Sequence, residues 1–167
     1  METLDTIYQR IEHARETSPT GEAVTVVAVI KNQPTQAANA LIQEGIGIVA
    51  ENRVQALRDR GADLLPSQRH IIGHLQTNKV KIAVTLADMI QSVDSMRLLH
   101  EIEKQSGQLG KKTEILFQVN IAKEESKFGA DKEDLPFLLR AASEMEHVTV
   151  RGLMAIMPIE TKVLYYR

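Results

Sequence analysis

The chain has 167 residues, of which 43% are hydrophobic and 25% charged, so it fits about one domain and is long enough to bury a core. It has no apolar run long enough to span a membrane and no cysteine, which excludes a disulfide framework, a thiolate zinc site and a cysteine nucleophile. A net charge of −2 and the absence of tryptophan argue against a nucleic-acid partner. We therefore expect a globular cytoplasmic protein that does not bind membranes.

Short apolar runs alternate with amphipathic segments along the whole chain. Leu4, Ile7 and Ile11 recur at helical spacing, which predicts an N-terminal helix that packs one narrow apolar stripe. Charges interrupt every turn of this segment, so it has no signal-peptide core. The segments expected to be strands are 23–30, 46–50, 70–73, 88–93, 113–121 and 148–156. The helices expected between them lie near 34–44, 54–64, 77–86, 95–107 and 131–145.

Six strands that alternate with helices predict parallel pairing through right-handed crossovers, and therefore an α/β fold. A complete (β/α)8 barrel takes about 250 residues and rarely fewer than about 200. A chain of this length with six strands corresponds to about three quarters of such a barrel. An open doubly wound sheet can be complete at this size. Periodicity does not choose between the two architectures.

In both architectures ligands bind where strands end, and these positions are polar in this sequence. The segments that follow the six strands are Lys31–Pro34, Glu51–Arg53, Gly73–Lys79, Ser92–Ser95, Asn120–Ile121 and Met154 onward. Lys31 directly follows an apolar strand, where partial desolvation would disfavour the ammonium form and leave an amine able to attack a carbonyl. The alternative is an ordinary solvated lysine in a loop.

His70 and His74 have the spacing of a helical metal pair, but four residues of a strand span about 13 Å, so the two imidazoles cannot share a metal ion. His74 is suited to donating a hydrogen bond in a pocket or stacking on a planar ring, and equally to an ordinary loop. Asn52 and Asn120 are either turn residues or ligand contacts. The charge run Glu124–Lys127 predicts a solvated loop.

Six stretches of the sequence carry a family resemblance. They are VAVIKNQP (27–34), AENRVQ (50–55), HIIGHLQTNKVK (70–81), IQSVDS (90–95), ILFQVNIAKEESKFG (115–129) and RGLMAIMP (151–158). Together they resemble the pyridoxal phosphate homeostasis protein family, whose members are related to the N-terminal barrel domain of alanine racemase. The combination is far more specific than any of its parts.

The resemblance implies a (β/α)8 TIM-barrel type of fold, here incomplete with about six βα units, in which Lys31 forms an aldimine with pyridoxal 5'-phosphate. It implies that Asn52, His74, Asn120 and Met154 also belong to the cofactor pocket. Asn52 would hydrogen-bond near the ring, His74 and Met154 would pack around it, and Asn120 would hold a polar group or water. No catalytic or metal-ligating residue is expected.

Members of the family continue beyond the equivalent of RGLMAIMP into segments that bind the cofactor phosphate. We therefore expect residues 1–167 to form a single pyridoxal-phosphate-binding barrel domain that lacks the last strands and phosphate loops, with residues 160–167 beginning a further helix. Unpaired edge strands predict lower stability and association through the open sheet edges, where the family itself would be monomeric. Ile30 and Ala50 are bulkier than the usual family residues and would add bulk close to the cofactor.

The function implied is that of a carrier in intracellular vitamin B6 homeostasis, which holds the cofactor without turning over a substrate. Pyridoxal-phosphate-dependent apoenzymes are the partners that such a carrier would serve. Two alternatives stay open. One is a racemase-like enzyme with Lys31 as a proton shuttle, and the other is a remnant that no longer binds the cofactor.

Overall fold

The computed structural model describes residues 3–121 and 128–157, and its centre is a six-stranded parallel sheet. The strands are β1 (Ala28–Val29), β2 (Ile48–Glu51), β3 (Gln68–Ile71), β4 (Met89–Val93), β5 (Thr113–Val119) and β6 (Val148–Ala155). The α-helices are α1 (Leu4–Thr17), α2 (Thr35–Gln43), α3 (Val54–Arg60), α4 (Val80–Leu86), α5 (Met96–Gln108) and α6 (Leu135–Ser143). Short 3-10 turns lie at η1 (Gly61–Asp63), η2 (Thr77–Lys79) and η3 (Lys132–Asp134).

The strands lie in the sheet in the same order as in the sequence, and every neighbouring pair is parallel. A doubly wound sheet would reverse its strand order at a switch point, so that alternative is wrong. Each new strand is added on the same side of the preceding one, as in a (β/α) barrel. The expected α/β class with six strands is confirmed. Within the described residues, β1 and β6 form its two ends.

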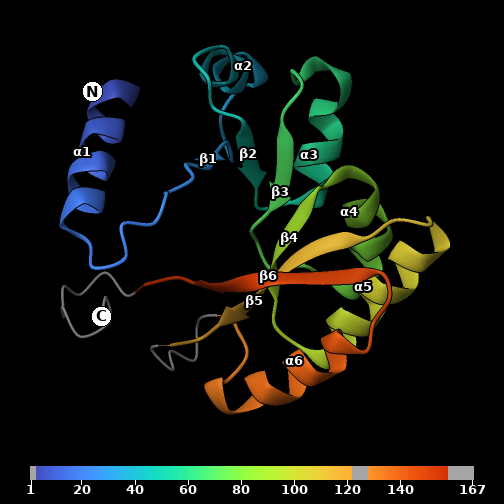
Figure 1. Cartoon of the computed structure of the whole chain (residues 1–167). Helices are drawn as coiled ribbons and strands as arrows, with labels where there is room; N and C mark the ends of the chain where they lie inside the picture. The colour runs from blue at the N-terminus through green and yellow to red at the C-terminus, as the bar shows by residue number, and fades with distance from the viewer. Residues whose placement is uncertain (1–2, 122–127, 158–167) are drawn as a thin grey trace.

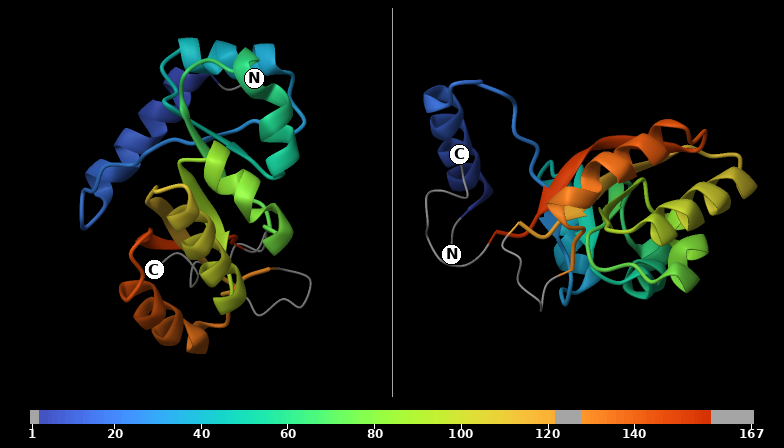
Figure 2. Two further views of the ribbon diagram at one scale, coloured as in Figure 1. Left: turned by 90° about the vertical axis from the view of Figure 1, so that its right-hand side faces the viewer. Right: turned by 90° about the horizontal axis from the view of Figure 1, so that it is seen from below.

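Helices α3 to α6 cover one side of the sheet, as Figures 1 and 2 show. The core between these two layers is formed by apolar side chains that are almost completely buried. Its strand members include Ile71, Ile90, Ile115 and Phe117, and its helix members include Leu57, Val84, Leu99 and Leu138. Burial of these side chains stabilises the packing of the helices on the sheet. Because every strand pair is parallel, the carboxyl ends of all six strands lie along one edge of the sheet.

The N-terminal region differs from the sequence prediction. The expected strand 23–30 pairs with β2 only over Ala28–Val29, and the side chains of Val24 and Val29 are 58% and 47% exposed. An end strand has a neighbour on one side only, and β2 itself has just four residues, so little of this segment can join the sheet. Helix α1 is present as expected, but it lies away from the sheet on the other side and buries no residue (Figure 1).

Two helix ends are explained by single residues. Ser95 precedes α5, and its side chain accepts a hydrogen bond from the backbone N–H of Leu98, the capping role that its position predicts. The helix expected near 54–64 ends earlier, at Arg60, because Gly61 adopts a positive φ of 45° and starts η1.

Two expectations concern parts of the chain that the structure does not describe. The solvated loop at Glu124–Lys127 and the helix start at 160–167 both lie outside the described residues. In residues 3–121 and 128–157, no helix has both the length and the apolar character that a membrane span needs.

Candidate functional site

A cavity of about 550 Å³ opens at the carboxyl ends of the strands. Its polar lining residues are Lys31, Asn52, His74, Gln91 and Gln118. Its apolar lining includes Val29, Ile72, Phe128, Met154 and Ile156. Each of the six strands, or the loop that follows it, contributes at least one side chain. The parallel sheet thereby brings together residues that are more than 120 positions apart in the sequence.

Four of the five site residues expected from the resemblance line this cavity: Lys31, Asn52, His74 and Met154. Asn120 is not on the cavity wall. Strand β5 ends at Val119, and the backbone N–H of Asn120 donates to the carbonyl oxygen of Ala130 at 3.0 Å. Strand β5 instead contributes Gln118 to the wall, two residues earlier in the chain, which is the spacing of side chains on one face of a strand.

Lys31 occupies the second position of a tight turn. The N–H of Gln33 donates to the carbonyl of Ile30 at 3.1 Å, and Asn32 has a positive φ of 61°. A type II turn needs a positive φ at its third position, and asparagine tolerates this conformation better than most residues. The turn directs Lys31 to the cavity and leaves Ile30 in the core.

Two expectations about the surroundings of Lys31 are corrected. Its side chain is exposed rather than sheltered, because β1 is the end of the sheet and no described strand covers its free side. The bulk of Ile30 and Ala50 does not reach the cavity, since both side chains are about 1% exposed and neither is part of its wall.

His74 forms the aromatic part of the cavity wall. Its ring stacks on that of Phe128, with centroids 3.8 Å apart and planes inclined by 11°, and its Nδ1 lies 3.3 Å from Oδ2 of Asp94. The acidic partner and the stacked ring together fix the plane of the imidazole. The sequence suggested a stacking role for His74, but Phe128 was missed because it follows a charged run that indicated only a solvated loop.

Gly73 allows the ends of β2 and β3 to approach closely beside the cavity. The N–H of Ile72 donates to the carbonyl of Glu51 at 3.0 Å, and a Cβ atom on Gly73 would lie 2.4 Å from the carbonyl oxygen of Asn52. Real Cβ atoms do not come that close to backbone. Glycine at this position therefore allows Asn52 to keep its place in the cavity wall.

Gln91 is held in the cavity wall by a buried histidine. Its Nε2 donates to Nδ1 of His70 at 2.7 Å, which requires a ring nitrogen without a proton. Burial lowers the pKa of His70, although the negative charges of Asp88 and Glu114 offset part of this effect. The neutral form that accepts the Gln91 hydrogen bond is thus favoured in the folded protein.

We expect His70 to make the stability of the fold depend on pH. Since its pKa is lower in the folded state, the unfolded chain binds more protons just below the ordinary value of about 6.5. The free energy of unfolding should therefore fall as the pH drops through about 6.5, and level off below the folded-state pKa. Urea unfolding between about pH 5 and 7.5 measures this slope. His70→Gln should flatten it and His100→Gln, at an exposed position, should not; equal slopes in both variants would contradict this role.

The fold and the cavity are those of one class of protein. The chain forms an unbroken series of parallel βα units, and the sequence model of the alanine racemase N-terminal domain family matches its residues 3–163. Alanine racemase from Clostridium difficile 630 shares this fold, with a TM-score of 0.73 at 13% identity over 98% of this chain and 46% of its own.

Within that class, the chain belongs to the pyridoxal phosphate homeostasis protein family. It is 35% identical over 157 residues to the Helicobacter pylori (strain 26695) protein of that name, covering 92% of this chain and 71% of the relative. The Aquifex aeolicus protein of the same name is 33% identical over 160 residues, covering 94% and 70%. PipY of Synechococcus elongatus PCC7942, solved with PLP bound, is 32% identical with a TM-score of 0.79, covering 96% of this chain and 74% of its own.

Proposed function

We propose that this chain binds pyridoxal 5'-phosphate reversibly through Lys31 and takes part in intracellular vitamin B6 homeostasis without turning over a substrate. The observation that carries the proposal is the position of Lys31, an amine that lines a cavity to which all six strands contribute. The names of the relatives and the cofactor in PipY support the same ligand. Apoenzymes that use the cofactor would be its recipients, and the cytoplasm its place of action.

The residues present suit the ring and the aldehyde of this cofactor. The cavity volume of about 550 Å³ lies within the usual range for small-ligand sites. The rings of His74 and Phe128 offer flat surfaces for a planar heterocycle, and the amides of Asn52, Gln91 and Gln118 offer donors and acceptors for its polar substituents. When bound, the cofactor supplies an aldehyde that condenses reversibly with a primary amine, and its oxygen leaves as water.

Each lining residue then has a distinct part in binding. Nζ of Lys31 makes the covalent link, Asn52 hydrogen-bonds at the ring edge, and His74 and Met154 restrict the position of the ring. In the described cavity wall, His74 is the titratable side chain besides Lys31, and its ring is stacked on Phe128. Stereochemical inversion needs proton donors and acceptors placed for both faces of a substrate, so this lining favours a carrier over a racemase.

The test is a titration of the purified protein with pyridoxal phosphate. We expect a visible absorption band from the covalent link, fixation of the adduct by borohydride, and a modified peptide that contains Lys31. Transfer of the unreduced cofactor to an apoenzyme should restore that enzyme's activity. Absence of the Lys31 adduct would refute the proposal, and sustained inversion of single-enantiomer alanine would replace the carrier with an enzyme.

A further inference from the structure

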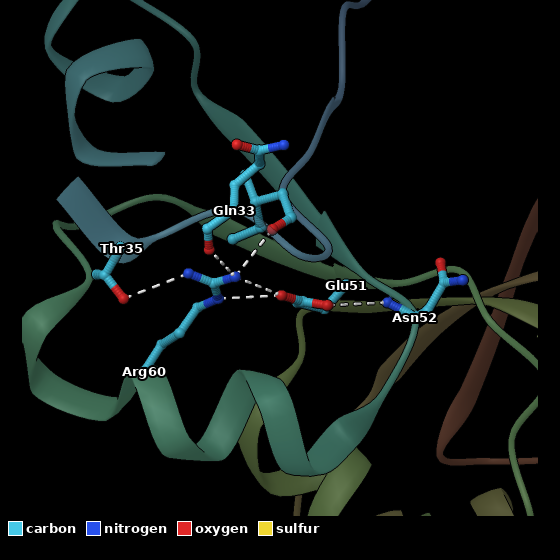
Figure 3. A network of polar contacts seen from close by, with 6 residues as sticks. Gln33, Thr35, Glu51, Asn52 and Arg60 are labelled. Atoms are coloured by element: carbon cyan, nitrogen blue, oxygen red, sulfur yellow. Dashed lines mark hydrogen bonds and ion pairs between the residues drawn. The ribbon is translucent and has the colours of Figure 1, made fainter. Parts of the chain in front are cut away.

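A buried ion pair lies beside the turn that carries Lys31 (Figure 3). Nη2 and Nε of Arg60 lie 2.9 Å and 3.0 Å from Oε1 of Glu51, and the two side chains are only 10% and 2% exposed. Removing two charges from water has a large desolvation cost, so a buried pair of this kind often adds little net stability over apolar packing. Its presence here points to a task other than stabilising the core.

The guanidinium group of Arg60 binds the backbone on both sides of Lys31. Nη2 donates to the carbonyl of Ile30 at 2.8 Å and to the carbonyl of Gln33 at 2.7 Å. Nη1 lies within 3.3 Å of the hydroxyl of Thr35, just beyond the turn. One side chain from the end of α3 therefore contacts the residues that precede and follow the lysine.

Glu51 connects this arrangement to the cavity wall. Its Oε1 accepts from Arg60, and its Oε2 accepts the backbone N–H of Asn52 at 3.2 Å. Figure 3 shows the contacts as a continuous series from the turn, through Arg60 and Glu51, to Asn52. The backbones of two cavity residues, Lys31 and Asn52, are thus held in relation to each other by one ion pair.

The sheet supplies little restraint of its own at this point. Strand β1 has two paired residues, and within the described chain it pairs with β2 alone. Beyond those residues, the N–H of Ile30 donates to the carbonyl of Ala50 at 2.9 Å. The exposed Lys31 turn needs a further anchor if its amine is to meet an aldehyde at a defined place.

We propose that Arg60, oriented by Glu51, is a positioning residue that clamps the Lys31 turn in the geometry needed for reaction with the cofactor aldehyde. This inference rests on the proposed function. Arginine is required because its planar fork donates to Glu51 and to both carbonyls at once, whereas a lysine ammonium has no fixed fork and would keep only the charge. Removing one partner of a buried ion pair also lowers stability, so the test must distinguish the position of the turn from a loss of folding.

The test compares Arg60→Met and Arg60→Lys with Arg58→Met. Arg58 is on the same helix and pairs with Asp59 at the surface, where both side chains are more than half exposed, so it is a matched control. Arg60→Lys keeps a positive charge beside Glu51 and should preserve folding even where Arg60→Met does not. Unfolding in urea first establishes conditions in which each variant is fully folded.

Two measurements then follow under those conditions. In the cofactor-free protein, amide hydrogen exchange of a peptide that spans residues 28–36 reports the clamp directly, and we expect both Arg60 variants to exchange roughly tenfold faster than wild type. With pyridoxal phosphate added, we expect the dissociation constant of the Lys31 adduct to rise about tenfold or more, as loss of one charge-assisted hydrogen bond predicts. Arg58→Met should match wild type in both.

The outcomes separate the clamp from its alternatives. Folded Arg60 variants with wild-type exchange and wild-type affinity would overturn the proposal. So would weakened binding with wild-type exchange, because the Lys31 turn would then be held as firmly as in wild type. If wild type forms no Lys31 adduct, the proposed function fails, and wild-type exchange in Arg60→Lys would then refute the clamp on its own.

Discussion

Replacement of Lys31 by methionine is expected to abolish the covalent adduct with pyridoxal phosphate. The variant keeps a flexible apolar side chain of similar length but has no amine to condense with the aldehyde. Neither the visible absorption band nor the borohydride-fixed mass increase should appear at any cofactor concentration. Since Lys31 is exposed, the free energy of unfolding should change by no more than about 0.5 kcal/mol.

Lys81→Met provides the matched control for this experiment. Lys81 is an exposed residue on helix α4 and is not part of the cavity wall. Its loss removes the same charge from the surface without touching the site, so the adduct should form as in wild type. An adduct that survives in Lys31→Met but vanishes in Lys81→Met would place the reactive amine elsewhere and end the proposal.

Gly73→Ala is expected to damage both the fold and the site. The added methyl would lie 2.4 Å from the carbonyl oxygen of Asn52, and this backbone atom cannot swing away as a side chain could. Overpacking of this kind costs about 1–3 kcal/mol of unfolding free energy. Because the displaced backbone belongs to a cavity residue, weaker cofactor binding should accompany the lower stability.

Gly47→Ala separates this steric effect from the general effect of replacing a glycine. A Cβ atom on Gly47, just before β2, meets nothing within 4 Å, and the residue has no positive φ. The variant should be neutral, or more stable by about 0.4–1 kcal/mol through the restricted unfolded chain. Urea unfolding measures the free energy of unfolding of both variants. A Gly73→Ala protein as stable as Gly47→Ala would show that β2 and β3 can separate freely.

The proposed carrier function and the proposed Arg60 clamp would make different demands on the same turn. Lys31 must be reachable by a free aldehyde, which its exposed side chain permits. Its backbone must also return to one place after each release of the cofactor, which the Arg60 contacts to Ile30 and Gln33 favour. A reversible binder needs both properties, since its amine reacts repeatedly rather than once.

The sequence by itself determined the α/β class, the approximate positions of six strands and most of the helices, and four of the side chains that meet in the cavity. A polar residue after a buried run is a local pattern, which marked Lys31 and His74 as candidates without separating a loop residue from a site residue; the family resemblance implied their place in the site. The prediction for 23–30 is wrong in length for the same reason. A run that is apolar on both faces indicates a long, covered strand, but only Ala28–Val29 pair with β2, and β1 has no second neighbour in the described sheet.

Only the tertiary structure decided which strand order the chain adopts, and which residues far apart in the sequence come into contact. The contacts of Arg60 with Ile30 and Glu51 join residues 30 and 9 positions apart, and the stacking of His74 on Phe128 joins residues far apart in the sequence. No periodicity in a sequence encodes such contacts, because they depend on how the ends of neighbouring strands are brought together. The physical reason is that parallel pairing places sequence-distant strand ends side by side. A charged side chain that becomes buried there needs a partner of opposite charge, and the fold determines which one lies within reach.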